Sequence, residues 1–167
     1  MILRRDSRVR ILLSRFESQS TGDATFLDKI NDLIEEESFS FYNECFSKCS
    51  LEMGKTLSKD EREKKALNEE KSLIYGEVDY HSFFRVLRKI NPNKGGTFYD
   101  LGSGTGKAVL AARFTRDFSR CIGIEILQGL HNAAVAVVNR FEKEFRRFLN
   151  SSHRQQVMYL MHIYVDV

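Results

Sequence analysis

The chain has 167 residues, 42% hydrophobic and 29% charged, an ordinary balance for one globular domain. It contains no run of 18 or more apolar residues, which argues against a membrane-spanning helix, and its net charge of +3 is too small to indicate nucleic-acid binding by itself. Residues 101–167 nevertheless carry nine Lys and Arg against five Asp and Glu, which permits an acidic partner such as DNA.

The amino-terminal segment has the composition of a possible targeting signal. Five arginines interleave with Ile11, Leu12 and Leu13 within residues 1–16, as in an amphipathic mitochondrial import peptide. Asp6 counts against this interpretation because import peptides are poor in acidic residues. Mitochondrial import is therefore kept as an alternative location only.

Helices are predicted for the first part of the chain. Asp23 is a good N-cap, and apolar residues recur after it at helical spacing: Phe26, Ile30, Leu33 and Ile34, with a less regular continuation through Phe41 and Phe46. Ser58 and Glu61 have the spacing of a capping box, which predicts a short helix over 59–70. We expect residues 1–72 to form a peripheral helical extension.

The three cysteines do not form the framework of a secreted, disulfide-linked domain. Cys45, Cys49 and Cys121 are odd in number and scattered, which favours a reducing compartment. Cys45 and Cys49 have the spacing of one helix face, without a His or further Cys nearby. We interpret them as small buried apolar side chains and predict no structural zinc.

Alternating strands and helices are predicted after residue 73. Asp79 caps a helix with an apolar face of Phe83, Leu87 and Ile90, which Pro92 ends. The expected order then is a strand over Thr97–Leu101, a helix over 105–118, a strand over 121–126, a helix with its buried stripe from Leu130 to Phe148, and a strand over 156–167. This alternation predicts an α/β fold with a parallel, Rossmann-like sheet over 73–167.

A glycine-rich turn follows the first predicted strand and opens the next helix. Gly102, Gly104 and Gly106 alternate with Ser103 and Thr105 and are followed by Lys107. Residues without a Cβ allow the main chain to turn sharply and lie against a ligand. The following helix N-terminus suits an anionic group, here the methionine carboxylate of S-adenosylmethionine.

Two carboxylates complete the predicted ligand site. Glu125 closes the second strand 19 residues after Gly106, where it can accept hydrogen bonds from both ribose hydroxyls. Asp100 is placed either to orient the loop or to face the ligand's ammonium. The turn and the two acids together predict a nucleoside-sized pocket at one edge of the sheet.

Two other nucleotide motifs resemble this turn. A phosphate-binding P-loop requires Gly at position 101 and Ser or Thr at 108, but the chain has Leu101 and Ala108. A dinucleotide fingerprint has the spacing G-x-G-x-x-G, and here the third glycine comes one residue early. S-adenosylmethionine is favoured, and a dehydrogenase fragment stays an alternative.

Four segments together resemble the DOT1 family of histone lysine methyltransferases over roughly residues 72–150: Ile74–Val78, 25 residues ahead of Asp100 when counted from Tyr75; Phe98–Gly104; Gly123–Glu125; and Phe141–Arg147. The resemblance implies that Tyr75, Gly76, Glu77 and Val78 lie over the methionine moiety, with Glu77 accepting from its ammonium. Lys107 departs from the uncharged residue, often Gln, that the family has there; its ammonium would meet the methionine carboxylate or point to solvent.

The resemblance also implies a function and a location. The expected activity is transfer of a methyl group from S-adenosylmethionine to a nucleosomal histone H3 lysine in the nucleus, with cytoplasm as the alternative. Class I methyltransferase sheets usually have seven strands, and 42 residues follow Glu125, so the domain is expected to be truncated after its third strand. That strand lacks the family's G-D-F-like end, unless Asp166 takes its role.

No catalytic or metal-ligating residue is assigned from the sequence. His81, His131, His153 and His162 lack the spacing of a metal site or a triad, and we expect them at the surface or at helix caps. Two other functions stay open: an inactive S-adenosylmethionine-binding or interaction module, and a class I methyltransferase acting on RNA or a small molecule.

Overall fold

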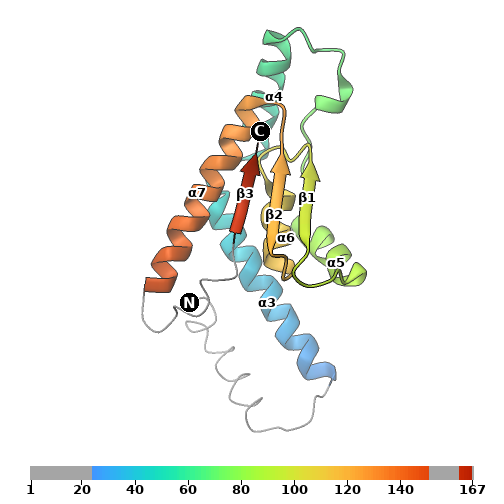
Figure 1. Cartoon of the computed structure of the whole chain (residues 1–167), viewed down its shortest axis with the longest axis vertical. Helices are drawn as coiled ribbons and strands as arrows, with labels where there is room; N and C mark the ends of the chain where they lie inside the picture. Colours follow the sequence, from blue (N-terminus) through green and yellow to red (C-terminus); the bar gives the residue numbers. More distant parts are fainter. Residues whose placement is uncertain (1–23, 151–161, 167) are drawn as a thin grey trace. The chain divides into compact units, whose positions relative to one another are not determined.

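The computed structural model of the chain describes residues 24–150 and 162–166 (Figure 1). The chain divides into two compact units, residues 1–41 and 42–167. Helix α3 (Ala24–Cys45) confirms the helix predicted from the apolar spacing after Asp23. Asp23 itself and the arginine-rich segment lie outside the described residues. The predicted division of the chain between residues 72 and 73 stays a prediction.

The second unit contains a parallel sheet of three strands. β1 (Thr97–Leu101), β2 (Arg120–Ile124) and β3 (His162–Asp166) lie in the order β1-β2-β3. In register, Leu101, Ile124 and Asp166 stand side by side at the carboxyl edge. The predicted Rossmann-like α/β class is confirmed. Residues 156–161 and 167 of the third predicted strand lie outside the described residues.

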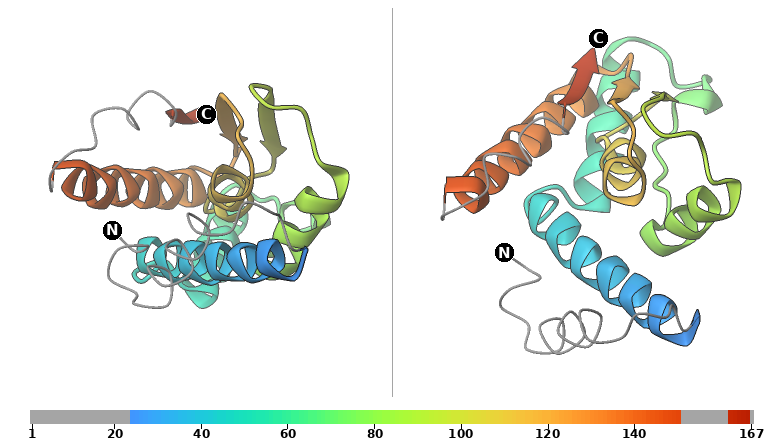
Figure 2. Two further views of the ribbon diagram at one scale, coloured as in Figure 1. Left: turned by 90° about the horizontal axis from the view of Figure 1, so that it is seen from below. Right: turned by 60° about the horizontal axis from the view of Figure 1, so that its bottom comes forward.

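Two crossover helices lie on the same side of the sheet (Figure 2, left). α6 (Lys107–Thr115) joins β1 to β2, and α7 (Gln128–Asn150) follows β2. One core cluster forms beneath the strands, where α5 (Tyr80–Ile90) also packs against α6. Its buried residues are Leu87, Val109, Ala112, Phe118 and Cys121. Burying apolar side chains in this layer fixes the strands whose carboxyl ends carry the candidate site.

The opposite face of β1 carries exposed apolar side chains. Tyr99 and Leu101 alternate with the more covered Phe98 and Asp100, which is the two-residue period of a strand with one covered face. Ile124, which pairs with Leu101, is exposed as well. Helix α6 therefore covers only one face of this strand pair among the described residues.

Helix α5 starts as predicted, and two of its three predicted core residues face the core: Leu87 is buried, and Phe83 packs against the same cluster. The Asp79 carboxylate accepts a hydrogen bond from Ser82 N at 2.9 Å, which confirms the N-cap. Ile90 was predicted on the buried face and is 66% exposed, so that assignment is wrong. Tyr80 and Phe84 are buried as well, so the buried stripe begins at residue 80, about one turn earlier than predicted.

Helix α4 (Leu51–Lys64) begins eight residues earlier than the helix predicted over 59–70. Its N-cap is Ser50, whose hydroxyl oxygen accepts from Met53 N at 3.1 Å. The predicted cap, Ser58, lies inside the helix, is 1% exposed, and donates its hydroxyl proton to Leu73 O at 2.8 Å. The capping-box assignment is wrong because a tertiary contact uses this hydroxyl. A short 3-10 helix, η1 (Lys71–Leu73), follows.

All three cysteines are free and buried, as expected of small apolar side chains. Burial raises the pKa of the Cys45 thiol to about 12 and that of Cys121 to about 11. The prediction that Cys45 and Cys49 share a helix face is wrong, since α3 ends at Cys45 and Cys49 lies in the turn before α4.

Among the histidines, His131 differs from its prediction. It is 7% exposed on α7 rather than at the surface or at a helix cap. His81 is half-buried on α5, and His153 lies outside the described residues. Among the described helices, none combines the length and the apolarity needed to cross a bilayer.

Candidate functional site

The glycine turn is anchored on the carboxyl end of β2. Gly102 N and Ser103 N both donate to Ile124 O, at 2.8 and 3.0 Å. Gly102, Gly104 and Gly106 have φ angles of 83°, 55° and 84°, in the left-handed region that favours glycine. The alternating glycines therefore allow a compact turn directly over the end of the neighbouring strand.

The carboxylate of Glu125 faces this turn. Its Oε2 accepts from Gly104 N at 2.7 Å and its Oε1 accepts from Leu127 N at 2.8 Å. The residue is only 5% exposed. A carboxylate offers about four lone-pair sites, so each oxygen can accept a further hydrogen bond. The structure thus brings together the two features that the sequence predicts to converge.

Four main-chain amides of the turn donate within the protein. Besides the three bonds above, Gly106 N donates to Ser103 O at 2.8 Å. These four amides therefore have partners inside the protein. The anionic group was expected at the N-terminus of the following helix, α6, which begins at Lys107.

Asp100 is a second carboxylate at the same edge, one residue before β1 ends. Within residues 24–150 and 162–166, no hydrogen bond or ion pair uses its side chain, so it does not orient the loop by such a contact. Burial, and then the charge of Glu125, raises the pKa of Asp100 above its usual value. A cationic group arriving here would relieve this repulsion between two carboxylates.

Ser103 contributes to the inner side of the turn. Its side chain is buried and lies against Gly123 of β2, where an added Cβ would stand 2.7 Å from Ser103 Oγ. Gly123 is therefore required for the turn to approach the strand. A Cβ on Gly106 would lie 3.5 Å from Ala134 Cβ, an ordinary contact, so the left-handed φ of 84° is what favours glycine there.

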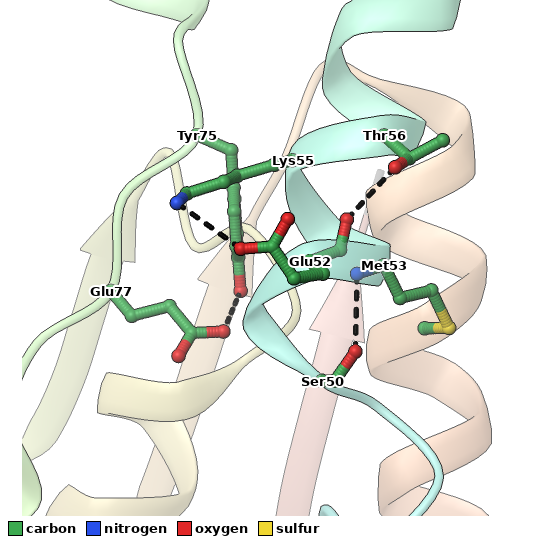
Figure 3. Close-up of polar contacts among 7 residues, drawn as sticks. All are labelled: Ser50, Glu52, Met53, Lys55, Thr56, Tyr75 and Glu77. Carbon is green, nitrogen blue, oxygen red and sulfur yellow. Dashed lines mark hydrogen bonds and ion pairs between the residues drawn. The ribbon is translucent and has the colours of Figure 1, made fainter.

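The ring of Tyr75 fills the space between α4 and the glycine turn. A Cβ on Gly54 would stand 2.2 Å from Tyr75 Cε1, and a Cβ on Gly104 would stand 2.6 Å from Cε2. The Tyr75 hydroxyl donates to Glu77 Oε1 at 2.7 Å and lies 2.7 Å from Thr105 Oγ1. Figure 3 shows the Tyr75–Glu77 bond beside the first turns of α4.

Burial, reinforced by the neighbouring Glu77, raises the pKa of Tyr75 well above its usual value. The phenol therefore stays neutral and can donate to the Glu77 carboxylate. Gly54 was missed by the sequence analysis. The available signal was a glycine inside a helix, which costs about 1 kcal/mol relative to alanine and needs a packing reason.

Lys107 pairs with Glu77 rather than pointing to solvent. Its Nζ lies 3.0 Å from Glu77 Oε2, and both side chains are largely covered. The same ammonium lies 4.8 Å from the centroid of the Phe46 ring, a cation–π distance. Glu77 thus joins Tyr75, before α5, to the first residue of α6.

The other two residues of the predicted Tyr75–Val78 segment are at the surface. A Cβ on Gly76 would meet nothing within 4 Å, and Val78 is exposed. Only Tyr75 and Glu77 of this segment reach the turn through the contacts above. In the described part of the chain, no group of three or more His, Cys, Asp and Glu is arranged to hold a metal ion.

Comparison with known proteins covers most of this unit. Residues 53–159 match the family model described as "Histone methylation protein DOT1". Over 52 residues, 31% of this chain, the sequence is 40% identical to a Drosophila melanogaster protein named "Histone-lysine N-methyltransferase, H3 lysine-79 specific". The aligned segment is 3% of that protein, so the chain spans only a small part of its length. The family match includes Gly54 and α4 from Met53 onward.

Proposed function

Since this chain belongs to the DOT1 family of histone methylation proteins, we propose that it binds S-adenosylmethionine at the glycine turn and methylates a lysine of histone H3 in the nucleosome. The main support is the convergence of Glu125 on Gly104, which puts a buried carboxylate beside a left-handed glycine at the carboxyl edge of a parallel sheet. Ligands of such sheets bind outside this edge. The proposed location is the nucleus, in chromatin.

The residues present fit the two ends of this ligand. At the nucleoside end, the remaining lone pairs of Glu125 would accept from the ribose hydroxyls. At the amino-acid end, Asp100 has a carboxylate with no partner among the described residues, and Glu77 supplies another. Lys107 has three ammonium donors, of which Glu77 uses one, so it can also pair with the ligand's carboxylate.

The methyl donor supplies an electrophilic methyl carbon, so the transfer needs little acid–base help from side chains. The protein's tasks are to fix the cofactor and to align a neutral lysine amine behind that methyl in a water-poor channel. Tyr75 and Glu77 would fix the cofactor's amino-acid end from one side of the turn. No side chain is assigned to the lysine channel.

Contact with nucleosomal DNA through basic residues is part of the proposal. Arg113 is not available for it, because it is buried and donates to the main-chain carbonyl of Phe118. Arg116 and Arg140 also donate to main-chain carbonyls, but each guanidinium keeps further donors. DNA contact would fall to basic residues other than Arg113.

Titration calorimetry with S-adenosylhomocysteine, followed by transfer assays with labelled S-adenosylmethionine, tests the proposal. The expected result is saturable binding and methylation of reconstituted nucleosomes, with neither free RNA nor small-molecule amines methylated. Binding without transfer to nucleosomes would instead indicate an inactive cofactor-binding module. Absence of binding by a chain with native circular dichroism would overturn the site assignment itself.

A further inference from the structure

One face of α4 contacts both segments that flank the glycine turn. Gly54, Ser58 and Glu61 are spaced by four and three residues, so they share a helix face. Gly54 meets the Tyr75 ring, and Ser58 donates to Leu73 O just ahead of Tyr75. These two residues fix the Tyr75 side of the site.

Glu61 contacts the other side. Its Oε1 accepts from Gln128 N at 2.9 Å, and its Oε2 accepts from Gly129 N at 2.7 Å. These amides belong to the first two residues of α7, so Glu61 caps a helix 67 and 68 residues further along the chain. A carboxylate suits this position, because the first amides of a helix have no partner within it and carry partial positive charge.

The local structure is adapted to this contact. A Cβ on Gly129 would lie 3.3 Å from Glu61 Oε2 and 3.4 Å from Leu57 Cδ2, so glycine lets α4 approach α7 closely. Burial opposes ionisation of Glu61, but hydrogen bonds from Gly129, Lys65 and Gln128 together lower its pKa. Glu61 is therefore ionised at neutral pH and accepts as a full carboxylate.

Three consecutive amides at the start of α7 thus go to two glutamates. Leu127 N donates to Glu125, and the next two amides donate to Glu61. Because Leu127 N donates a hydrogen bond to the Glu125 carboxylate, the position of the Leu127 main chain sets the orientation of that carboxylate. Leu127 is itself held in a cluster with Tyr75 and Leu130, against which Leu57 of α4 packs.

We infer that Glu61 is a positioning residue of the cofactor site, which holds the start of α7 so that Glu125 faces Gly104 and the ribose. This inference rests on the proposed function. It predicts that Glu61 affects binding of the nucleoside end of the ligand, not of its amino-acid end.

The test compares Glu61→Ala and Glu61→Gln with the matched control Glu63→Ala in the full chain. Glu63 is on the same helix, with its side chain 54% exposed. The probes are S-adenosylhomocysteine and 5′-methylthioadenosine, which lacks the amino-acid end. Glu61→Ala should weaken both probes about equally, by about tenfold, because a small misplacement of a positioned group costs that much or more. Glu61→Gln has one acceptor oxygen for two amides and should fall between wild type and alanine.

Three outcomes would overturn the inference. A lower melting temperature with unchanged affinity for both probes would mean a purely structural role. Weaker binding of S-adenosylhomocysteine alone would place the effect at the amino-acid end. Equal losses in Glu63→Ala would mean a non-specific effect. If the wild-type chain binds neither probe, the proposed function fails instead.

Hydrogen exchange in the wild-type protein gives a second measurement that needs no folded variant. Saturating 5′-methylthioadenosine should slow exchange of the amides of Leu127, Gln128 and Gly129 together, because the ligand would hold the segment that Glu61 and Glu125 cap. Unchanged exchange at these amides, with the probe bound, would contradict the inference.

Discussion

The Tyr75 ring lies where a side chain on Gly104 would have to go. A Cβ at Gly104 would stand 2.6 Å from Tyr75 Cε2, and the φ angle of Gly104 is +55°. Both facts exclude larger residues at this position. Substitution of Gly104 therefore disturbs the protein's own packing before it reaches any ligand.

Gly104→Ala should lower both stability and cofactor affinity. Displacing the Tyr75 ring and straining the turn should cost about 1–3 kcal/mol of unfolding free energy. Urea unfolding and calorimetry with S-adenosylhomocysteine measure the two effects. Gly76→Ala is the matched control, since its Cβ meets nothing within 4 Å, and it should behave like wild type. Wild-type stability in Gly104→Ala would contradict this packing.

Gly54→Ala separates helix propensity from packing by the sign of its effect. Propensity alone predicts a gain of about 1 kcal/mol in stability. The structure predicts a loss, because the new Cβ would stand 2.2 Å from the Tyr75 ring. In a Tyr75→Ala background the clash is gone and the same substitution should stabilise. Thermal melts of the four proteins check this, and a gain in both backgrounds would show that the ring does not lie on Gly54.

Glu125→Gln should weaken S-adenosylhomocysteine and 5′-methylthioadenosine alike. The amide nitrogen cannot accept, so one of Gly104 N and Leu127 N loses its partner. Leaving a buried donor unpaired costs about 1–3 kcal/mol of unfolding free energy. Affinity should fall as well, because the amide side chain offers fewer acceptor sites to the ribose hydroxyls. Glu69→Gln, at an exposed position, is the control. Equal affinities of wild type and both variants for these ligands would contradict the assignment of Glu125 to the site.

Asp100→Asn should raise stability at neutral pH and lower cofactor affinity. The folded-state pKa of Asp100 is raised above 3.8, first by burial and then by Glu125. A raised pKa means that its contribution to stability is fully present below the unfolded value and is lost as pH rises through the folded value. The free energy of unfolding of the variant should therefore equal that of wild type below about pH 4. Above that pH it should exceed the wild-type value by an increasing amount.

Binding measurements with the same Asp100→Asn variant test its proposed role. If Asp100 faces the ligand's ammonium, the variant should bind S-adenosylhomocysteine more weakly and 5′-methylthioadenosine unchanged. Melting temperatures across pH, together with calorimetry for both ligands, give the full comparison. A stability difference that does not vary with pH would rule out the electrostatic explanation.

The elements that sequence patterns predicted well are those set by local signals. The strand at Thr97–Leu101 and the Asp79 cap of α5 depend on alternation, a breaker and a capping side chain within a few residues. The convergence of the glycine turn and Glu125 followed from parallel topology, because adjacent strands end at the same edge.

The parts that could not be predicted depend on contacts far apart in the sequence. Ser58 and Glu61 have perfect capping-box spacing, yet Ser58 bonds Leu73 and Glu61 caps α7. Gly54 is unfavourable for a helix by propensity, and the reason for it is the Tyr75 ring that packs against it. The ion pair of Lys107 with Glu77 was not predicted either. None of these partners can be read from neighbouring residues.

Because Glu61 caps α7, a fragment must include α4 to retain a native site. A protein expressed from residue 73 onward would lack α4, and the amides of Gln128 and Gly129 would lose their acceptor. A fragment expressed from Tyr42, where the second compact unit begins, keeps Glu61 as the acceptor. Work on a shortened version, including crystallisation, should therefore start upstream of Ser50.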